Sequence, residues 1–219
     1  MTSDLEAEIG DAERVALNYA KPDIRPKLAS FFALDRRLGQ IVANSSGPLL
    51  GQMRITWWRD MLSASARDRP AGDVVLDAIG ASWGGDAQLL QLLADAWEVF
   101  LIAEELTADI LSQFVQGRAT PLAQAFGCAH EGVAKQVQEA GSLWALADTA
   151  AHVSDQAERE LILELARAKL NVNTSAGSMP RALAVLTALS RRSIRSGGRP
   201  LMVGRGAALT ALRAGLIGK

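Results

Sequence analysis

The chain has 219 residues and a net charge of −1, and 49% of its residues are hydrophobic against 21% charged. This composition is typical of a soluble globular protein, and no segment approaches the roughly 18 uninterrupted apolar residues of a membrane-spanning helix. The single cysteine, Cys128, excludes an intrachain disulfide and a cysteine-rich zinc site. The acidic N-terminus lacks the apolar and basic regions of a targeting signal, so we expect one cytoplasmic domain over residues 1–219.

Helical periodicity runs through nearly every segment between glycines and prolines, and β-branched residues never cluster as they do in strands. The sequence therefore predicts an all-α fold. The expected helices, in chain order, span residues 5–19, 27–44, 49–66, 74–82, 86–105, 107–116, 121–126, 131–152, 155–169, 180–195 and 204–217. A loop is expected at 67–72 and a linker at 171–179, and Ser154 is expected to cap the helix that begins at Asp155.

The second and third expected helices each carry a charge within an apolar face. Asp35 lies in the apolar stripe of the first of this pair, and Arg54 projects from the middle of the other. The apolar face around Arg54 is expected to hold Leu50, Met53, Trp57, Trp58 and Met61. Because a buried charge is costly unless it is paired, we predict an ion pair between Asp35 and Arg54. The alternative is that both line a polar patch in a ligand cavity.

Two adjacent tryptophans, Trp57 and Trp58, follow Arg54 on the same expected helix. Neighbouring residues on a helix point in directions about 100° apart, so the pair cannot face one spot. We expect one ring in the core and the other at its edge. The two histidines, His130 and His152, have no companion at metal-ligand spacing, and we assign them no catalytic role.

The stretch from Leu28 to Leu62 resembles the front of the squalene/phytoene synthase family. In that family, the first helix carries an arginine and a cluster of aspartates that holds Mg²⁺ against a prenyl diphosphate, and the second helix is rich in tryptophan. The resemblance runs through Phe32, Arg36 and Trp57. It places the family's acidic cluster on three residues without carboxylates, Gly39, Gln40 and Ala43. Because proteins usually hold Mg²⁺ through carboxylates and substrate phosphates, this metal site is expected to be lost.

The second aspartate motif of the family has its best counterpart in residues 141–155. Asp148 and Asp155 lie seven residues apart there, farther than in the family, so we expect this metal site to be lost as well. The resemblance extends over about residues 15–217 and implies a truncated trans-isoprenoid-synthase-like helical fold. It is closest to a short non-catalytic branch that includes the mitochondrial complex I assembly factors.

Two functions follow from the resemblance. The first is a non-catalytic protein, without cofactor or catalytic residues, that acts as a respiratory-complex assembly factor or as a prenyl-lipid-binding module. The alternative is a Mg²⁺-dependent head-to-head prenyl transferase with degenerate motifs, in which Asp35, Asp148 or Asp155 would hold the metal. The implied partners are an isoprenoid lipid, an anionic membrane surface or a protein. The candidate cavity residues are Asp35, Arg36, Gly39, Arg54, Trp57, Trp58 and Asp148.

Arg36 stands where the family's arginine helps to hold diphosphate, and Arg37 is beside it. The planar guanidinium suits phosphate because it can donate two hydrogen bonds at once. Surface helices also carry such arginine pairs routinely, so a solvated pair is the alternative.

The charge of the chain is unevenly distributed. Residues 177–219 contain no Asp or Glu and carry +8, whereas residues 1–176 sum to −9. A basic helical pair at about 180–219 either packs on the acidic body or meets an anionic partner such as lipid headgroups, which would place the protein at the periphery of a membrane. Nucleic acid is not expected, because the arginines are not interleaved with aromatic residues. The candidate anionic-partner patch comprises Arg191, Arg192, Arg195, Arg199 and Arg205.

Overall fold

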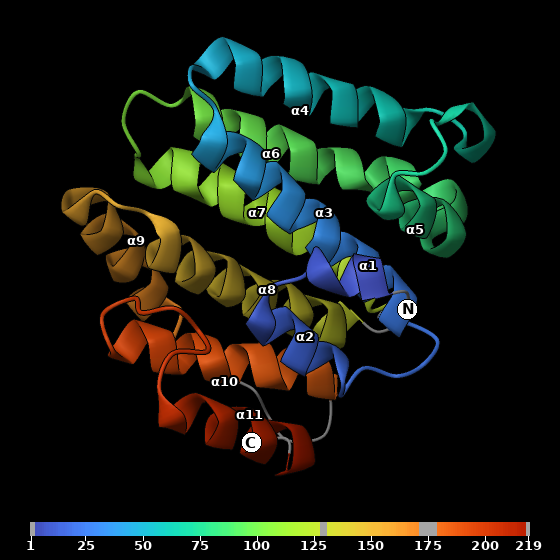
Figure 1. The fold of residues 1–219 in the computed structure, drawn as a ribbon. Coiled ribbons are helices and arrows are strands. Elements are labelled where there is room, and N and C mark those ends of the chain that lie inside the picture. Colours follow the sequence, from blue (N-terminus) through green and yellow to red (C-terminus); the bar gives the residue numbers. More distant parts are fainter. Residues whose placement is uncertain (1–2, 128–130, 171–178, 218–219) are drawn as a thin grey trace. The chain divides into compact units, whose positions relative to one another are not determined.

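The computed structural model describes residues 3–127, 131–170 and 179–217, and every regular element in these ranges is a helix (Figure 1). The predicted all-α class is therefore confirmed. Within the same ranges, no helix combines the length and apolar character needed to cross a bilayer. The chain divides into two compact units, Met1–Gly10 with Pro22–Pro121 and Asp11–Lys21 with Leu122–Lys219, which we call unit 1 and unit 2. The organisation of residues 1–219 as one domain stays a prediction.

In unit 1, the long helix α3 is the central element. It contacts α1, α4, α5 and α6, and its inward face buries a row of large apolar side chains with no exposed surface: Leu28, Phe31, Leu34 and Leu38. The elements of this unit are α1 (Ser3–Ala7), α3 (Arg25–Asn44), α4 (Pro48–Ser63), η1 (Ala66–Asp68), α5 (Val74–Trp83), η2 (Gly84–Leu90), α6 (Gln91–Ile102) and most of α7 (Ala108–Ala125). This arrangement places the middle of α3, including Asp35, in the interior of the unit.

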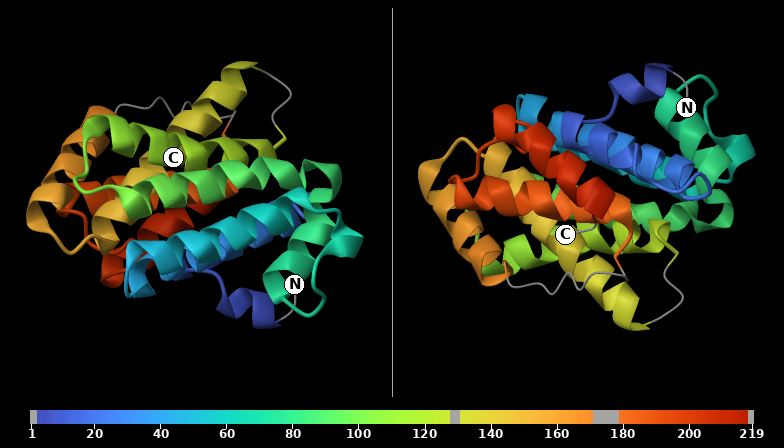
Figure 2. Two further views of the ribbon diagram at one scale, coloured as in Figure 1. Left: turned by 90° about the horizontal axis from the view of Figure 1, so that it is seen from above. Right: turned by 90° about the horizontal axis from the view of Figure 1, so that it is seen from below.

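In unit 2, helix α10 has the central position. It contacts α2, α8, α9 and α11, and α10 and α11 run side by side (Figure 1, and the right view of Figure 2). The elements of this unit are α2 (Asp11–Leu17), α8 (Glu131–His152), α9 (Gln156–Ala168), α10 (Arg181–Arg195) and α11 (Arg205–Ile217). Helix α2 is joined to α8 by a buried hydrogen bond of 2.8 Å from Nε1 of Trp144 to Oε1 of Glu13.

Several predicted boundaries differ from the structure. The helix expected at 5–19 is broken around Gly10 into α1 and α2, which belong to different units. The helices expected at 107–116 and 121–126 form one helix, α7, with Pro121 inside it. A proline removes one backbone hydrogen bond and bends a helix, but it does not have to end one. The expected helix at 86–105 begins instead as the 3₁₀ helix η2, and the loop at 67–72 begins within η1.

Aspartates cap the N-termini of α5 and α9. The carboxylate of Asp73 accepts hydrogen bonds from the backbone N–H groups of Val75 and Leu76 at the start of α5. At α9, the capping residue is Asp155, whose carboxylate accepts a 2.9 Å bond from the N–H of Glu158, so the assignment of the cap to Ser154 was wrong. Both side chains satisfy N–H groups that a helix start leaves without partners. Most of the predicted linker at 171–179 lies outside the described residues.

Candidate functional site

A buried ionic cluster forms around Asp35, the most distinctive polar residue of α3. Its carboxylate accepts hydrogen bonds from Nε of Arg118 at 2.9 Å, from Nη2 of Arg118 at 2.6 Å and from Nε1 of Trp97 at 2.8 Å. Asp35 is 5% exposed and Arg118 has no exposed surface. Such desolvation is tolerated only where the charges face each other and the remaining hydrogen-bonding atoms are satisfied. The cluster therefore joins α3, α6 and α7 within unit 1.

Aromatic rings enclose the guanidinium of Arg118. Its Cζ atom lies 5.1 Å from the ring centroid of Trp97 and 5.3 Å from that of Phe114. The two rings meet edge to face, with centroids 4.9 Å apart, and Phe100 stacks against Phe114 at 4.5 Å. A cation over desolvated aromatic faces gains favourable electrostatic energy. The surroundings of the ion pair are thus packed with side chains.

Two glycines allow the helices to approach closely at this cluster. A Cβ atom on Gly39 of α3 would lie 3.0 Å from Cη2 of Trp97, and one on Gly117 of α7 would lie 2.6 Å from Cβ of Ala96. Neither position has room for a larger side chain. Gly39 is also one of the residues aligned with the acidic cluster of the squalene/phytoene synthases. In this protein, the space that a side chain at residue 39 would enter is occupied by an indole ring.

The predicted ion pair between Asp35 and Arg54 was wrong. Arg54 lies on the exposed side of α4, whereas the carboxylate of Asp35 is bound by Arg118 and Trp97. The buried face of α4 consists of Gly51, Ile55, Trp58 and Leu62. A helix with apolar residues on two sides can bury either side. In α4 the side with Gly51 is buried, because the missing side chain leaves room for Leu101 of α6. A Cβ atom on Gly51 would lie 2.6 Å from Cδ2 of Leu101.

The tryptophan pair is split between core and surface as predicted. Trp58 is 3% exposed and Trp57 is 41% exposed. Their rings meet edge to face, with centroids 5.2 Å apart and an interplanar angle of 83°. Trp58 therefore contributes to the core of unit 1, whereas Trp57 is available at the surface.

Arg36 and Arg37 are both bound within unit 1. Arg36 donates hydrogen bonds to the backbone carbonyls of Ala7 at 3.3 Å and Ile9 at 2.8 Å, at the end of α1. Arg37 forms an ion pair with Glu8 at 2.7 Å. Carbonyls at a helix end have no partner inside the helix, so an arginine that reaches them stabilises the chain there.

Asp148 of unit 2 lies at the end of α8, near the exposed His152, with 3.5 Å between its Oδ1 and Nδ1 of the imidazole. Asp155 caps α9. In the portion of the chain that the structure describes, no three side chains of His, Cys, Asp or Glu gather closely enough to hold a metal ion.

The candidate basic patch is only partly exposed. Arg195, Arg199 and Arg205 are exposed, whereas Arg191 and Arg192 are half-buried. Arg192 donates a 2.9 Å hydrogen bond to the carbonyl of Val203 and so holds the loop before α11. Burial lowers the pKa of Arg191, and the charge of Arg195 lowers it further. Arg191 and Arg192 are therefore partly packed into unit 2, which a count of charges along the sequence could not reveal.

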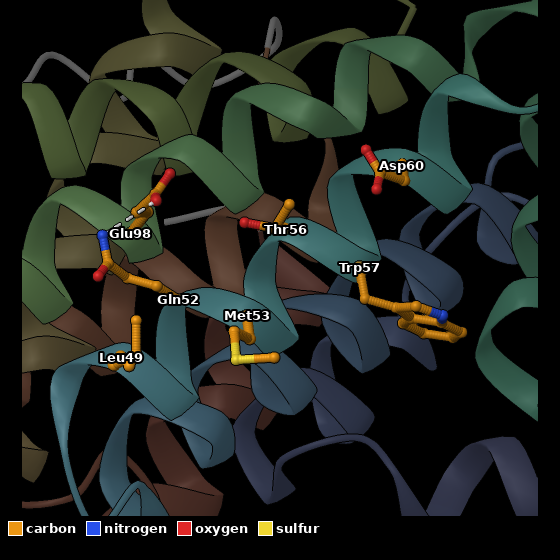
Figure 3. A pocket seen from close by; sticks show the side chains of 7 residues that line it. All are labelled: Leu49, Gln52, Met53, Thr56, Trp57, Asp60 and Glu98. Atoms are coloured by element: carbon orange, nitrogen blue, oxygen red, sulfur yellow. Dashed lines mark hydrogen bonds between the residues drawn. The ribbon is translucent and has the colours of Figure 1, made fainter.

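An open groove runs along the outer side of α4, beside α6 (Figure 3). It has a volume of about 460 Å³ and is lined by Leu49, Gln52, Met53, Thr56, Trp57, Asp60 and Glu98. Its apolar lining residues are open to solvent, because Leu49 is 71% exposed and Met53 is 62% exposed. Glu98, at its edge, is bound by Arg59 and by Gln52. The sequence pattern had placed Met53 and Trp57 on one apolar face of this helix and had included Trp57 among the candidate cavity residues.

Trp97 and Arg118 were absent from the predicted site. The signal for Arg118 exists in the sequence, because it continues a helical stripe of buried apolar residues formed by Leu111, Phe114, Val115 and Leu122. The predicted break after residue 116 divided this stripe and concealed the buried arginine.

Comparisons of the chain with protein-family models, with curated proteins and with solved structures found no significant match.

Proposed function

We propose that this protein is a non-catalytic helical protein of the isoprenoid-synthase-like type, and that it acts by binding a partner, as an assembly factor of a respiratory complex. The observation that carries the proposal is the packing of Trp97 on Gly39. The resemblance aligns Gly39 with a metal-binding acidic residue, and the contact leaves no room for a carboxylate at that position.

The charged residues of α3 support the same proposal. Asp35 could serve as a metal ligand only if its carboxylate were released from Arg118, which holds it with two hydrogen bonds. Arg36, the candidate diphosphate ligand, is occupied by the carbonyls of Ala7 and Ile9. Releasing Asp35 from its buried pair with Arg118 would cost about 3–5 kcal/mol. The structural partners of Asp35 and Arg36 thus support a non-catalytic role for α3.

Turnover of prenyl diphosphates tests this proposal against the prenyl transferase alternative. Purified protein is incubated with farnesyl or geranylgeranyl diphosphate and Mg²⁺ or Mn²⁺, and the organic extract is analysed by mass spectrometry. We expect no squalene, phytoene or presqualene diphosphate. Product that scales with protein concentration would overturn the proposal, and its loss in Asp35→Asn would identify the cluster as the catalytic site.

The groove beside α4 supports a second candidate function, the binding of a prenyl lipid. The apolar side chains of Leu49, Met53 and Trp57 in its lining offer a surface for a hydrocarbon chain, and ligand sites are typically concave and apolar. Trp57 provides the readout, because it lines the groove and is 41% exposed. For this candidate, farnesol should shift the tryptophan emission to the blue in a saturable manner, and Trp57→Phe should abolish the shift. An unchanged spectrum would eliminate the groove as a prenyl site.

A further inference from the structure

Helix α11 has its large and small residues on unexpected sides. Among the residues of α11 that the structure describes up to residue 216, those buried against the rest of unit 2 are small: Ala207, Ala211, Ala214 and Gly215. The opposite face carries Leu209, Leu212 and Leu216, which are 69%, 49% and 64% exposed. A surface helix normally turns its larger apolar residues towards the core. These three leucines therefore contribute little burial to the core of unit 2.

Close packing explains why the buried side is small. A Cβ atom on Gly215 would collide with Cε1 of Tyr19, so the backbone of α11 lies directly against that ring. Ala207, Ala211 and Ala214 are each no more than 2% exposed. Leucines would not fit on this side without moving the helix outward. The small residues let α11 sit close to its neighbours, and its leucines remain at the surface.

The exposed leucines form one stripe with a basic residue at its start. Arg205, Leu209, Leu212 and Leu216 follow the spacing i, i+4, i+7 and i+11, which places them along one line of a helix. We call this line the leucine stripe. Arg213 is exposed beside it, and no acidic residue occurs between 177 and 219. The outer face of α11 is thus both apolar and cationic.

We propose that the leucine stripe docks on the surface of a membrane that contains anionic lipids. A helix that presents leucines with flanking arginines lies in the interface of a bilayer, where the apolar side chains enter the acyl boundary and the cations meet the headgroups. The long arginine side chains can place their charges at headgroup level while their stems follow the apolar surface. This inference does not depend on the proposed function of the protein.

A second copy of the chain is the competing occupant of this surface. Two copies that paired through the same face would place Arg205 and Arg213 of both copies in one interface, and α11 has no acidic residue to neutralise them. Like charges placed opposite each other disfavour association. The charge of the face therefore favours an anionic bilayer over self-association.

Co-sedimentation with vesicles tests the proposal on the full chain. Vesicles of phosphatidylcholine with phosphatidylglycerol are compared with vesicles of phosphatidylcholine alone, at low and at high salt. We expect binding to the anionic vesicles and its loss in high salt, because salt screens the headgroup attraction. Equal binding to both kinds of vesicle, or no binding to either at low salt, would overturn the proposal.

Matched variants identify the surface responsible. Leu212→Gln should raise the lipid concentration needed for half-binding about tenfold, since it removes one leucine from the acyl boundary. Ile102→Gln on α6 is the control, because both residues are 49% exposed, and it should leave binding unchanged. Arg213→Glu should weaken binding by a similar factor or more, whereas Arg67→Glu on η1, with the same change of charge, should not.

Two further measurements separate the other outcomes. Circular dichroism and thermal melts show whether each variant is folded, so that a loss of binding can be assigned to the surface. Sedimentation velocity reports the state of association without lipid. Self-association that Leu212→Gln abolishes, together with vesicle binding that it leaves intact, would assign the leucine stripe to a second copy and overturn the membrane proposal.

Discussion

Asp35 of α3 and Arg118 of α7, which are 83 residues apart in the chain, form a buried bidentate ion pair with N–O distances of 2.9 and 2.6 Å. The N–H group of Trp97 is a further donor to the same carboxylate. Two parallel hydrogen bonds require a particular orientation of both side chains, so the pair specifies the register of α3 against α7 as well as neutralising two charges.

Arg118→Met should destabilise unit 1 by about 3–5 kcal/mol, because it leaves the carboxylate of Asp35 buried without its cation. Combining it with Asp35→Asn should recover part of the loss, since the double variant no longer buries an unpaired charge. Denaturant melts of the two single variants and the double variant measure this coupling. Strict additivity of the two changes would refute the energetic link between the residues.

Arg54→Met provides the matched control for that cycle. Arg54 was the partner expected from the sequence, but it is exposed on α4. Surface substitutions away from special features change stability by no more than about 0.5 kcal/mol. A loss as large as that of Arg118→Met would show that Arg54 has a structural role that its exposure conceals.

Gly39→Ala should destabilise the protein by about 1–3 kcal/mol through overpacking. Its new Cβ would meet the ring of Trp97 at 3.0 Å, and that ring is held in place by its hydrogen bond to Asp35. Gly80→Ala on α5 is the control, because the nearest atom to its Cβ would be 3.7 Å away. Alanine favours a helix over glycine, so this variant should gain about 0.5–1 kcal/mol. Opposite signs in urea melts are the expected result, and a neutral Gly39→Ala would mean that the ring can move aside.

Asp155→Ala should lower stability by about 1 kcal/mol, because it removes the side chain that accepts the N–H of Glu158 at the start of α9. Ser154→Ala, one residue earlier, should have little effect. The comparison of their thermal melts distinguishes the cap seen in the structure from the one expected from sequence. An effect of Ser154→Ala larger than that of Asp155→Ala would contradict the assignment.

Trp144→Phe should destabilise unit 2 by about 2–4 kcal/mol. The change deletes the hydrogen bond to Glu13 that joins α8 to α2, and it leaves a small cavity where the larger ring of the indole was buried. Trp57→Phe, at a surface position, should change stability by no more than about 0.5 kcal/mol. Calorimetry on both variants checks the difference, and equal melting temperatures would argue against a structural role for the buried bond.

Part of the candidate site could be read from the sequence. The stripe on α3 correctly predicted that Asp35 is buried and that it needs a cationic partner. The adjacency of Trp57 and Trp58 correctly predicted one buried and one exposed ring. These inferences succeeded because they rest on the geometry of a single helix, in which the direction of each side chain follows from its position in the chain.

The inward face of α4 was not predictable in the same way. The apolar residues of α4 lie on two sides of the helix. Hydrophobicity alone predicts that the side with Met53 and Trp57 is buried, rather than the side that contains Gly51. The structure buries the glycine face, because the missing side chain lets Leu101 approach. The stability of a closely packed interface depends on complementary shape as well as on buried apolar area. The shape of the neighbouring helix cannot be read from the sequence of α4 alone.

The sequence by itself determined the helical class, most of the helix positions, the burial of Asp35 and the acid-free segment from 177 to 219. Each of these depends on residues that are near in the chain or on composition alone. Only the tertiary structure decided that Arg118 neutralises Asp35, that Trp97 covers Gly39, and that α11 turns its alanines inward and its leucines outward. The physical reason is that the partner of a buried charge, or of a close helix contact, is a residue distant in the chain that the packing brings near. The chain contains many residues of a suitable type, and the sequence does not show which of them reaches that position.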